Sequence, residues 1–179
     1  MGRKESKAWD CIHSLCAANK MEEQNLYKRA RLLLSSYSGL CWSRAAWDTL
    51  AKDPLSVEDA MCTHLAFQYL RDYPVDETKQ EFITHVSNLV DVRVLQDIVN
   101  HTLMRVREFP VFGKIHFEIL NKCYLSSIGY QEDDILFELD IERSRYYDRK
   151  KEAIMLFGIV FWASALPHYE ELIKAVRSA

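Results

Sequence analysis

Glycine and proline, the residues that tight turns need most, are scarce in this sequence, at 5 and 4 of 179 residues. An all-β sandwich or barrel requires many such turns, so their scarcity excludes these classes and favours long helices. The sequence also lacks a run of about 18 apolar residues, and we therefore expect no transmembrane helix. The most apolar stretch, residues 154–166, is shorter and predicts a buried helix.

Cysteine patterns that mark a disulfide framework or a zinc site are missing too. The five cysteines are odd in number, none are spaced C-x-x-C, and the first ten residues contain no apolar signal segment. This combination favours free thiols in a reducing cytoplasm. Cys11, His13 and Cys16 lie close together, but their spacing is not a standard zinc pattern, and core packing explains them better. We expect neither a metal nor another cofactor.

Sequence motifs of catalysis are absent as well. We find no H-E-x-x-H, G-x-S-x-G, P-loop or G-x-G-x-x-G pattern, and no paired acid, base or nucleophile stands out. Trp42 and Trp47 favour packing over a ligand pocket. Four histidines on or near apolar faces predict core or boundary positions: His64, His85, His101 and His116. The sequence therefore predicts a binding protein rather than an enzyme.

Helical periodicity dominates what is present, and it predicts an all-α protein. The expected helices cover residues 6–19, 22–47, 56–73, 78–89, 92–108, 114–126, 132–139 and 143–163, with a final helix that follows Pro167 and ends near residue 176. Phe109-Pro110 interrupts this series, because the residue before a proline disfavours helix. It predicts a boundary between a helical bundle at residues 1–109 and a C-terminal region at residues 110–179.

The C-terminal region contains the pattern of a helix-turn-helix unit at residues 133–157. A short helix and a longer helix are separated by a connection at residues 140–142, which is the length that this unit requires. Apolar side chains of both helices and of the turn are expected to pack together: Ile135, Leu136, Leu139, Ile141, Tyr146, Ala153, Ile154 and Phe157.

The first turns of the longer helix are basic on the side left open to solvent. Net charge is −3 for the whole chain, so only this local surplus indicates a nucleic acid. In helix-turn-helix proteins these turns enter the major groove, where arginine binds guanine with two hydrogen bonds. An ordinary solvated helix face has a similar charge pattern. The predicted DNA-contacting residues are Arg143, Ser144, Arg145, Tyr147, Arg149, Lys150 and Lys151.

The stretch from Leu139 to Ile154, L-D-I-E-R-S-R-Y-Y-D-R-K-K-E-A-I, resembles the C-terminal motif of phage-type transcriptional regulators of the ArpU and RinA kind. These regulators look like the DNA-binding region 4 of sigma factors. The resemblance covers about 45 residues and implies that the seven residues named above contact DNA. Glu142 stands where the family often has serine, and Arg145 where it often has threonine. The loss of the serine weakens the expected helix cap.

Together these observations predict a cytoplasmic transcriptional regulator that binds double-stranded DNA, with RNA polymerase as a further partner and no membrane association. One reading helix per chain suggests a homodimer. Residues 154–162 and the final helix are the expected interface. The rival hypothesis is a helical protein-interaction adaptor, in which the basic helix meets an acidic protein and DNA is not bound.

Overall fold

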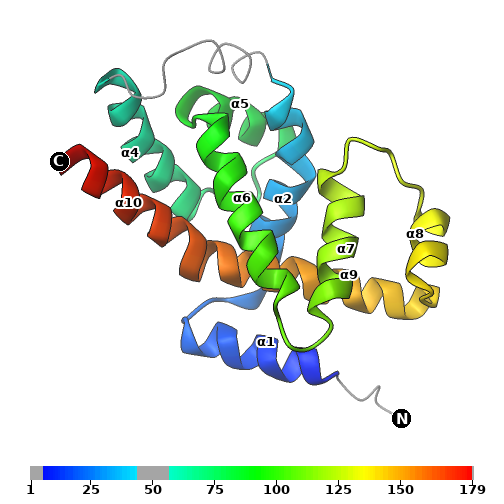
Figure 1. Ribbon diagram of the computed structural model, residues 1–179. Helices are drawn as coiled ribbons and strands as arrows, with labels where there is room; N and C mark the ends of the chain where they lie inside the picture. The colour runs from blue at the N-terminus through cyan, green and yellow to red at the C-terminus, as the bar shows by residue number, and fades with distance from the viewer. Residues whose placement is uncertain (1–5, 44–56, 179) are drawn as a thin grey trace.

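The computed structural model describes residues 6–43 and 57–178, with side chains described from residue 64 onward in the second range. This part of the chain is all-α and contains no strand, as the sequence predicts. Figure 1 shows the arrangement. The helices are α1 (Lys7–Ala18), α2 (Glu23–Cys41), α4 (Val57–Asp72), α5 (Lys79–Leu89), α6 (Val92–Arg107), α7 (Gly113–Leu120), α8 (Glu132–Leu139), α9 (Arg143–Val160) and α10 (Leu166–Ser178), with π-helical segments η1 (Asn121–Leu125) and η2 (Phe161–Ala165).

Side chains with short polar groups fix where several helices begin. The Ser6 hydroxyl accepts a hydrogen bond from the backbone N–H of Trp9 at the start of α1. Thr78 and Glu81 form a reciprocal capping box at the start of α5. Asp91 accepts from the N–H of Arg93 at the start of α6. Such caps satisfy N–H groups that have no partner inside the helix, and each is worth about 0.5–2 kcal/mol.

The second half of α9 runs through the centre of the molecule (Figure 1) and packs against α1, α2, α6 and α7. Its residues from Ala153 to Ile159 are all buried. A Cβ atom at Gly158 would lie 2.9 Å from Leu26 Cδ1, so the glycine lets α2 approach α9 closely. One hydrophobic core thus includes side chains from both sides of Phe109-Pro110, and the two predicted regions share it.

This packing corrects the expected dimer interface. Ile154, Phe157 and Phe161 are at most 1 % exposed within a single chain. The Trp162 side chain is partly buried, and its indole N–H donates to the Leu70 carbonyl at 2.9 Å. Residues 154–159 and Phe161 are therefore core, and only Val160 and Trp162 keep partial exposure. On α10, by contrast, Leu172 and Val176 are exposed.

Pro167 does not stop the helix that precedes it. The chain continues from α9 through the π-helical segment η2 into α10, and Pro167 is the second residue of α10. A proline is tolerated in the first turn of a helix because the N–H that it lacks has no intrahelical partner there. The wider turn of η2 allows a new first turn, that of α10, to begin at Leu166 while the helix continues.

The run Arg143–Ser178 is the one candidate membrane span among the described residues, by length and composition alone. Of its most apolar window, 61 % is buried inside the protein. Because a core helix passes the same test as a membrane helix, burial within the bundle accounts for this apolar segment.

Ser56, the predicted cap of α4, and Trp47 lie outside the described residues. Trp42, at the end of α2, is 65 % exposed.

Candidate nucleic-acid interface

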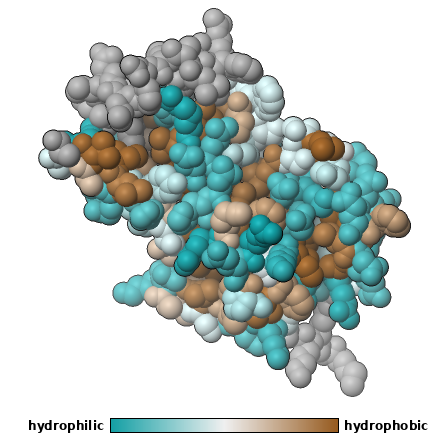
Figure 2. Space-filling view, viewed as in Figure 1, coloured by the Kyte–Doolittle hydropathy of each residue, from teal (hydrophilic) through white to brown (hydrophobic). Residues whose placement is uncertain are grey.

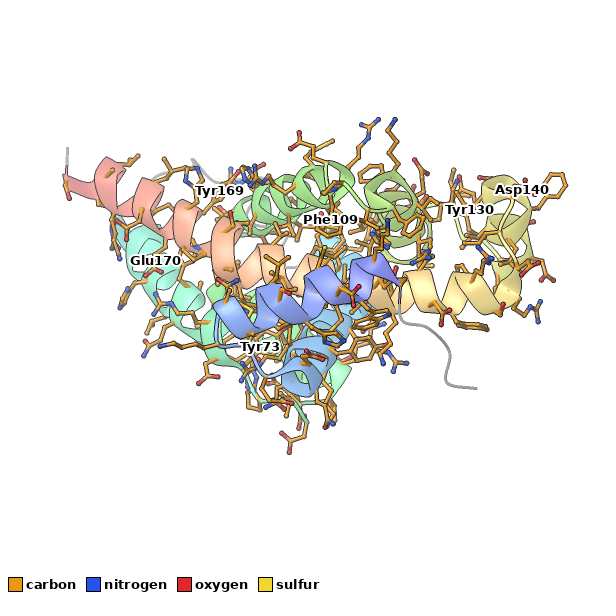
Figure 3. All side chains as sticks on the ribbon, turned by 90° about the horizontal axis from the view of Figure 1, so that it is seen from below. Tyr73, Phe109, Tyr130, Asp140, Tyr169 and Glu170 are labelled. Atoms are coloured by element: carbon orange, nitrogen blue, oxygen red, sulfur yellow. The ribbon has the colours of Figure 1, made fainter. Side chains whose placement is uncertain are left out.

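A second, smaller core joins α7, α8 and the beginning of α9. Ile119, Ile135 and Tyr146 are its buried members, one from each helix. Leu136, Leu139 and Ile141 are among the side chains that pack against them, as the sequence predicts. This small core holds α8 at the end of the molecule, where Figure 3 labels Tyr130 and Asp140. The position of α8 relative to α9 is thus fixed by apolar contacts.

The connection between α8 and α9 is tight. Asp140 has a left-handed backbone (φ 48°), which aspartate tolerates better than most residues. The N–H of Ile141 donates to the Leu136 carbonyl at 3.2 Å, which satisfies a carbonyl of the last turn of α8. Glu142 is extended and is the residue before α9, which begins at Arg143 as predicted. No side chain caps α9, consistent with glutamate at the position where the resembled family often has serine.

The first turns of α9 expose the face that the sequence predicts. The exposed fraction is 62 % for the Arg143 side chain and 71 % for that of Arg145. Tyr147 is 52 % exposed, while its neighbour Tyr146 is only 1 % exposed. Ser144 and Lys151 are exposed as well. In Figure 3 these turns extend past the end of α1, so no other helix covers them from that side.

Acidic residues of α8 neutralise one flank of this face. Arg143 Nη2 lies 2.7 Å from an Asp133 carboxylate oxygen, and its Nε lies 3.5 Å from Glu132. The Tyr147 hydroxyl donates to Glu132 at 2.8 Å, and this hydrogen bond raises the pKa of the phenol. These carboxylates also suit the positive end of the α8 dipole. The α8 flank of the face therefore carries fixed negative charge beside Arg143.

Arg149 and Lys150, which the sequence predicts at the flank of the open face, are partly buried and contact other side chains of the protein. The Arg149 side chain is 12 % exposed, its guanidinium hydrogen-bonds Glu152, and it stacks on the Phe112 ring at 3.7 Å. Lys150 Nζ lies 3.5 Å from the Tyr146 hydroxyl and 5.6 Å from the Tyr124 ring centre. Both cations are engaged by partners within the chain, so neither is available to a phosphate without breaking those contacts.

Glu152 is the fully buried carboxylate that engages Arg149, and sequence reasoning did not single it out. It also receives hydrogen bonds from the Ser6 hydroxyl at 2.5 Å and from His116 Nε2 at 3.0 Å. Burial opposes ionisation of Glu152, but the hydrogen bonds from His116, Ser6 and Arg149 outweigh burial and lower its pKa. The network ties the start of α1, α7 and α9 together and so fixes α1 beside the exposed face.

His116 is the one histidine of the predicted four that is fully buried; His64 and His85 are exposed. Because the ionised Glu152 can only accept, His116 Nε2 must carry a proton. Its Nδ1 is buried and has no hydrogen-bonding partner within the described part of the chain. Desolvation by burial lowers the pKa of His116 despite the nearby Glu152. The ring is therefore neutral at pH 7.

This depressed pKa predicts a loss of stability in mild acid. As the pH falls below about 6.5, the unfolded chain binds a proton at His116 before the folded chain does, so the free energy of unfolding decreases. We expect the wild type to lose more stability between about pH 7 and pH 5 than a His116→Gln variant, in urea titrations at both values. Equal losses in the two proteins would contradict the assignment, since the other histidines are common to both.

Cys11, His13 and Cys16 do not form a ligand cluster. Cys16 is buried, and His13 Nδ1 lies 2.7 Å from Glu23. No group of three or more potential metal-ligating side chains is found in residues 6–43 or in the described side chains from residue 64 onward. Comparisons with protein-family models, curated proteins and solved structures find no match to this chain. Its function must therefore be inferred from its own residues.

Proposed function

We propose that this protein is a helix-turn-helix transcriptional regulator that binds double-stranded DNA with the first turns of α9. The proposal depends mainly on one observation: Tyr146 is buried with Ile119 and Ile135, while Arg143, Ser144, Arg145 and Tyr147 are exposed in the same turns. A reading helix is placed in the major groove by one arrangement: a short helix, a three-residue connection and a longer helix with an open N-terminal face.

The proposed mechanism is occupancy of a specific duplex site. Arg143 and Arg145 lie one turn or less from the start of α9, where arginine side chains reach guanine edges. The ion pair of Arg143 with Asp133 does not prevent this, because both side chains are largely exposed. Exposed pairs are worth about 0–1 kcal/mol, whereas a two-hydrogen-bond contact with guanine contributes about 1–3 kcal/mol of discrimination.

Two further surfaces fit the partners that this function implies. Leu172 and Val176 are exposed on α10, and Figure 2 shows apolar side chains gathered at the end of the molecule where α4 and α10 lie. We propose this end as the contact in a homodimer. Phe137 on α8 is 88 % exposed beside the reading helix, which suits contact with RNA polymerase while DNA is bound. The protein would act in the cytoplasm.

Removal of exposed side chains from α9 provides the test. Selection of bound sequences from a random duplex pool should yield a consensus for the wild type. We expect an Arg143→Ala, Tyr147→Ala double variant to lose about 1–3 kcal/mol of discrimination at one or two base pairs, because base contacts carry specificity. Lys79→Ala on α5 is the control: it also removes a cation, but from a helix whose main contacts are with α2 and α4. A consensus unchanged in the double variant would contradict the proposal.

The alternative, a protein-interaction adaptor, is favoured by one specific observation. The carboxylates of Glu132 and Asp133 already neutralise Arg143, and Phe137 next to them is almost fully exposed. The adaptor expected from the sequence would meet an acidic protein through the basic helix, whereas this observation favours a contact through α8. Either adaptor would show no salt-sensitive retention on heparin or duplex DNA. A regulator would show such retention, since phosphate contacts weaken with salt.

A further inference from the structure

A groove of about 950 Å³ lies between α1, the start of α2 and the first half of α9. Its floor begins at Ser144 and Arg145, so it is continuous with the exposed face of α9. Its walls come from Trp9 on α1 and Lys28 on α2, which both lie more than 100 residues before the α9 floor in the sequence. The Ser6–Glu152 hydrogen bond holds the first wall in place. The groove is therefore a built feature of the fold, next to the proposed reading helix.

Cationic side chains line this groove from two elements. Lys28 is exposed on α2, and Arg145 and Lys151 are exposed on α9. The ammonium of Lys151 lies 5.2 Å from the centre of a Trp9 ring, which positions it at the groove wall. Arg145 has one weak ion pair, with Glu142 at 3.9 Å.

The carboxylates of the groove do not cancel these cations. Glu152 is buried and paired with Arg149, which leaves Glu23 and Asp148 against three exposed cations; Glu23 keeps its charge although it lies 2.7 Å from His13. Asp148 is partly buried in the groove floor and has its own interaction within the chain. The groove rim thus keeps exposed positive charge, in contrast with the opposite flank.

The two flanks of α9 differ in sign. On the α8 side, Glu132, Asp133 and Asp134 fill the first helical turn, and Arg143 is already paired with two of them. A phosphate backbone would be repelled there, although helix N-termini usually attract phosphates. On the groove side the lining has one more cation than carboxylate: Lys28, Arg145, Arg149 and Lys151 against Glu23, Asp148 and Glu152. A polyanion that approaches α9 is therefore directed to the groove.

From this asymmetry we propose that the groove binds the phosphate backbone of one DNA strand beside the major groove that α9 occupies. The inference rests on the proposed function and names Lys28 and Lys151 as backbone contacts. DNA is the occupant because the groove is continuous with the reading turns of α9, so that a duplex on those turns brings a strand alongside it. Such contacts fix register and orientation and carry no sequence information.

The experiment measures how the affinity for duplex DNA depends on salt. Lys28→Ala and Lys151→Ala are titrated with a fluorescent duplex of random sequence over a range of salt concentrations. Each lost phosphate contact lowers the slope of log K against log salt by about 0.9. We expect that decrease in each variant, with the selected consensus sequence unchanged. Lys79→Ala, which removes the same charge from a helix that does not line the groove, should keep the wild-type slope. Thermal melts should show that all variants are folded.

The outcomes separate this inference from the proposed function. Wild-type slopes in both groove variants would overturn the inference, while a consensus that depends on Arg143 and Tyr147 would leave the regulator proposal intact. A wild-type protein that binds no duplex DNA at low salt would overturn both. A decrease in slope equal to that of the Lys79 control would show only a general charge effect and would also refute the groove contacts.

Discussion

Replacement of Glu152 with alanine is expected to lower the free energy of unfolding by about 3–5 kcal/mol, the usual cost of removing one partner from a buried ion pair. The carboxylate is fully buried, and it satisfies Arg149, His116 and Ser6. Without it, the 12 %-exposed guanidinium of Arg149 loses its counterion. His116 would then have neither ring nitrogen hydrogen-bonded. Denaturant titration at pH 7 measures the loss.

Two matched variants separate charge from hydrogen bonding at this position. Glu152→Gln keeps the volume and the acceptor oxygen but removes the charge, so we expect an intermediate loss. Ser6→Ala removes one donor and the N-cap of α1, and should cost about 0.5–2 kcal/mol. If Glu152→Ala lowers the free energy of unfolding by less than about 1 kcal/mol, the hydrogen-bond network does not stabilise the fold as proposed.

Local rules were sufficient for most helices of this fold. Apolar residues every three to four positions located α5 and α6, and the Thr78–Glu81 capping box marks the start of α5. The π-helical segment before Pro167 was missed, because single-sequence rules treat a proline as a breaker and carry no signal for a wider turn. Burial of residues 154–166 was predicted, but residues 154–162 were also assigned to a dimer interface, since periodicity shows that a face is apolar but not which chain covers it.

In the candidate site, too, some features follow from local helical spacing and others depend on tertiary contacts. The burial of Tyr146 and the exposure of Arg143 and Tyr147 follow from helical spacing alone, and both were predicted. The inward turn of Arg149 depends on Glu152 and Phe112, which meet it only in the folded chain. A charged residue directly before the apolar run 153–161 was the one available signal, because a carboxylate at a core position must have partners.

Replacement of Tyr146 with alanine is expected to detach α8 from α9. Tyr146 is 1 % exposed, and with Ile119 and Ile135 it forms the whole buried part of the small core. Truncation of a large buried aromatic side chain costs about 3–5 kcal/mol, and this core is too small to absorb that loss. We expect amide hydrogen exchange in α8 to approach that of an unfolded chain, while α2, which packs on the second half of α9, stays protected.

Tyr146→Phe is the control for that experiment. It keeps the ring and removes only the hydroxyl, which lies 3.1 Å from Cys123 Sγ and 3.5 Å from Lys150 Nζ. The loss of this hydrogen bonding should cost about 0.5–1.5 kcal/mol and leave α8 protected. If α9 reads DNA only while α8 is held against it, Tyr146→Ala should also abolish the sequence preference, and Tyr146→Phe should retain it. Retention of the preference in Tyr146→Ala would mean that α9 binds DNA without α8, and the α8–α9 pair would then have no role in reading the duplex.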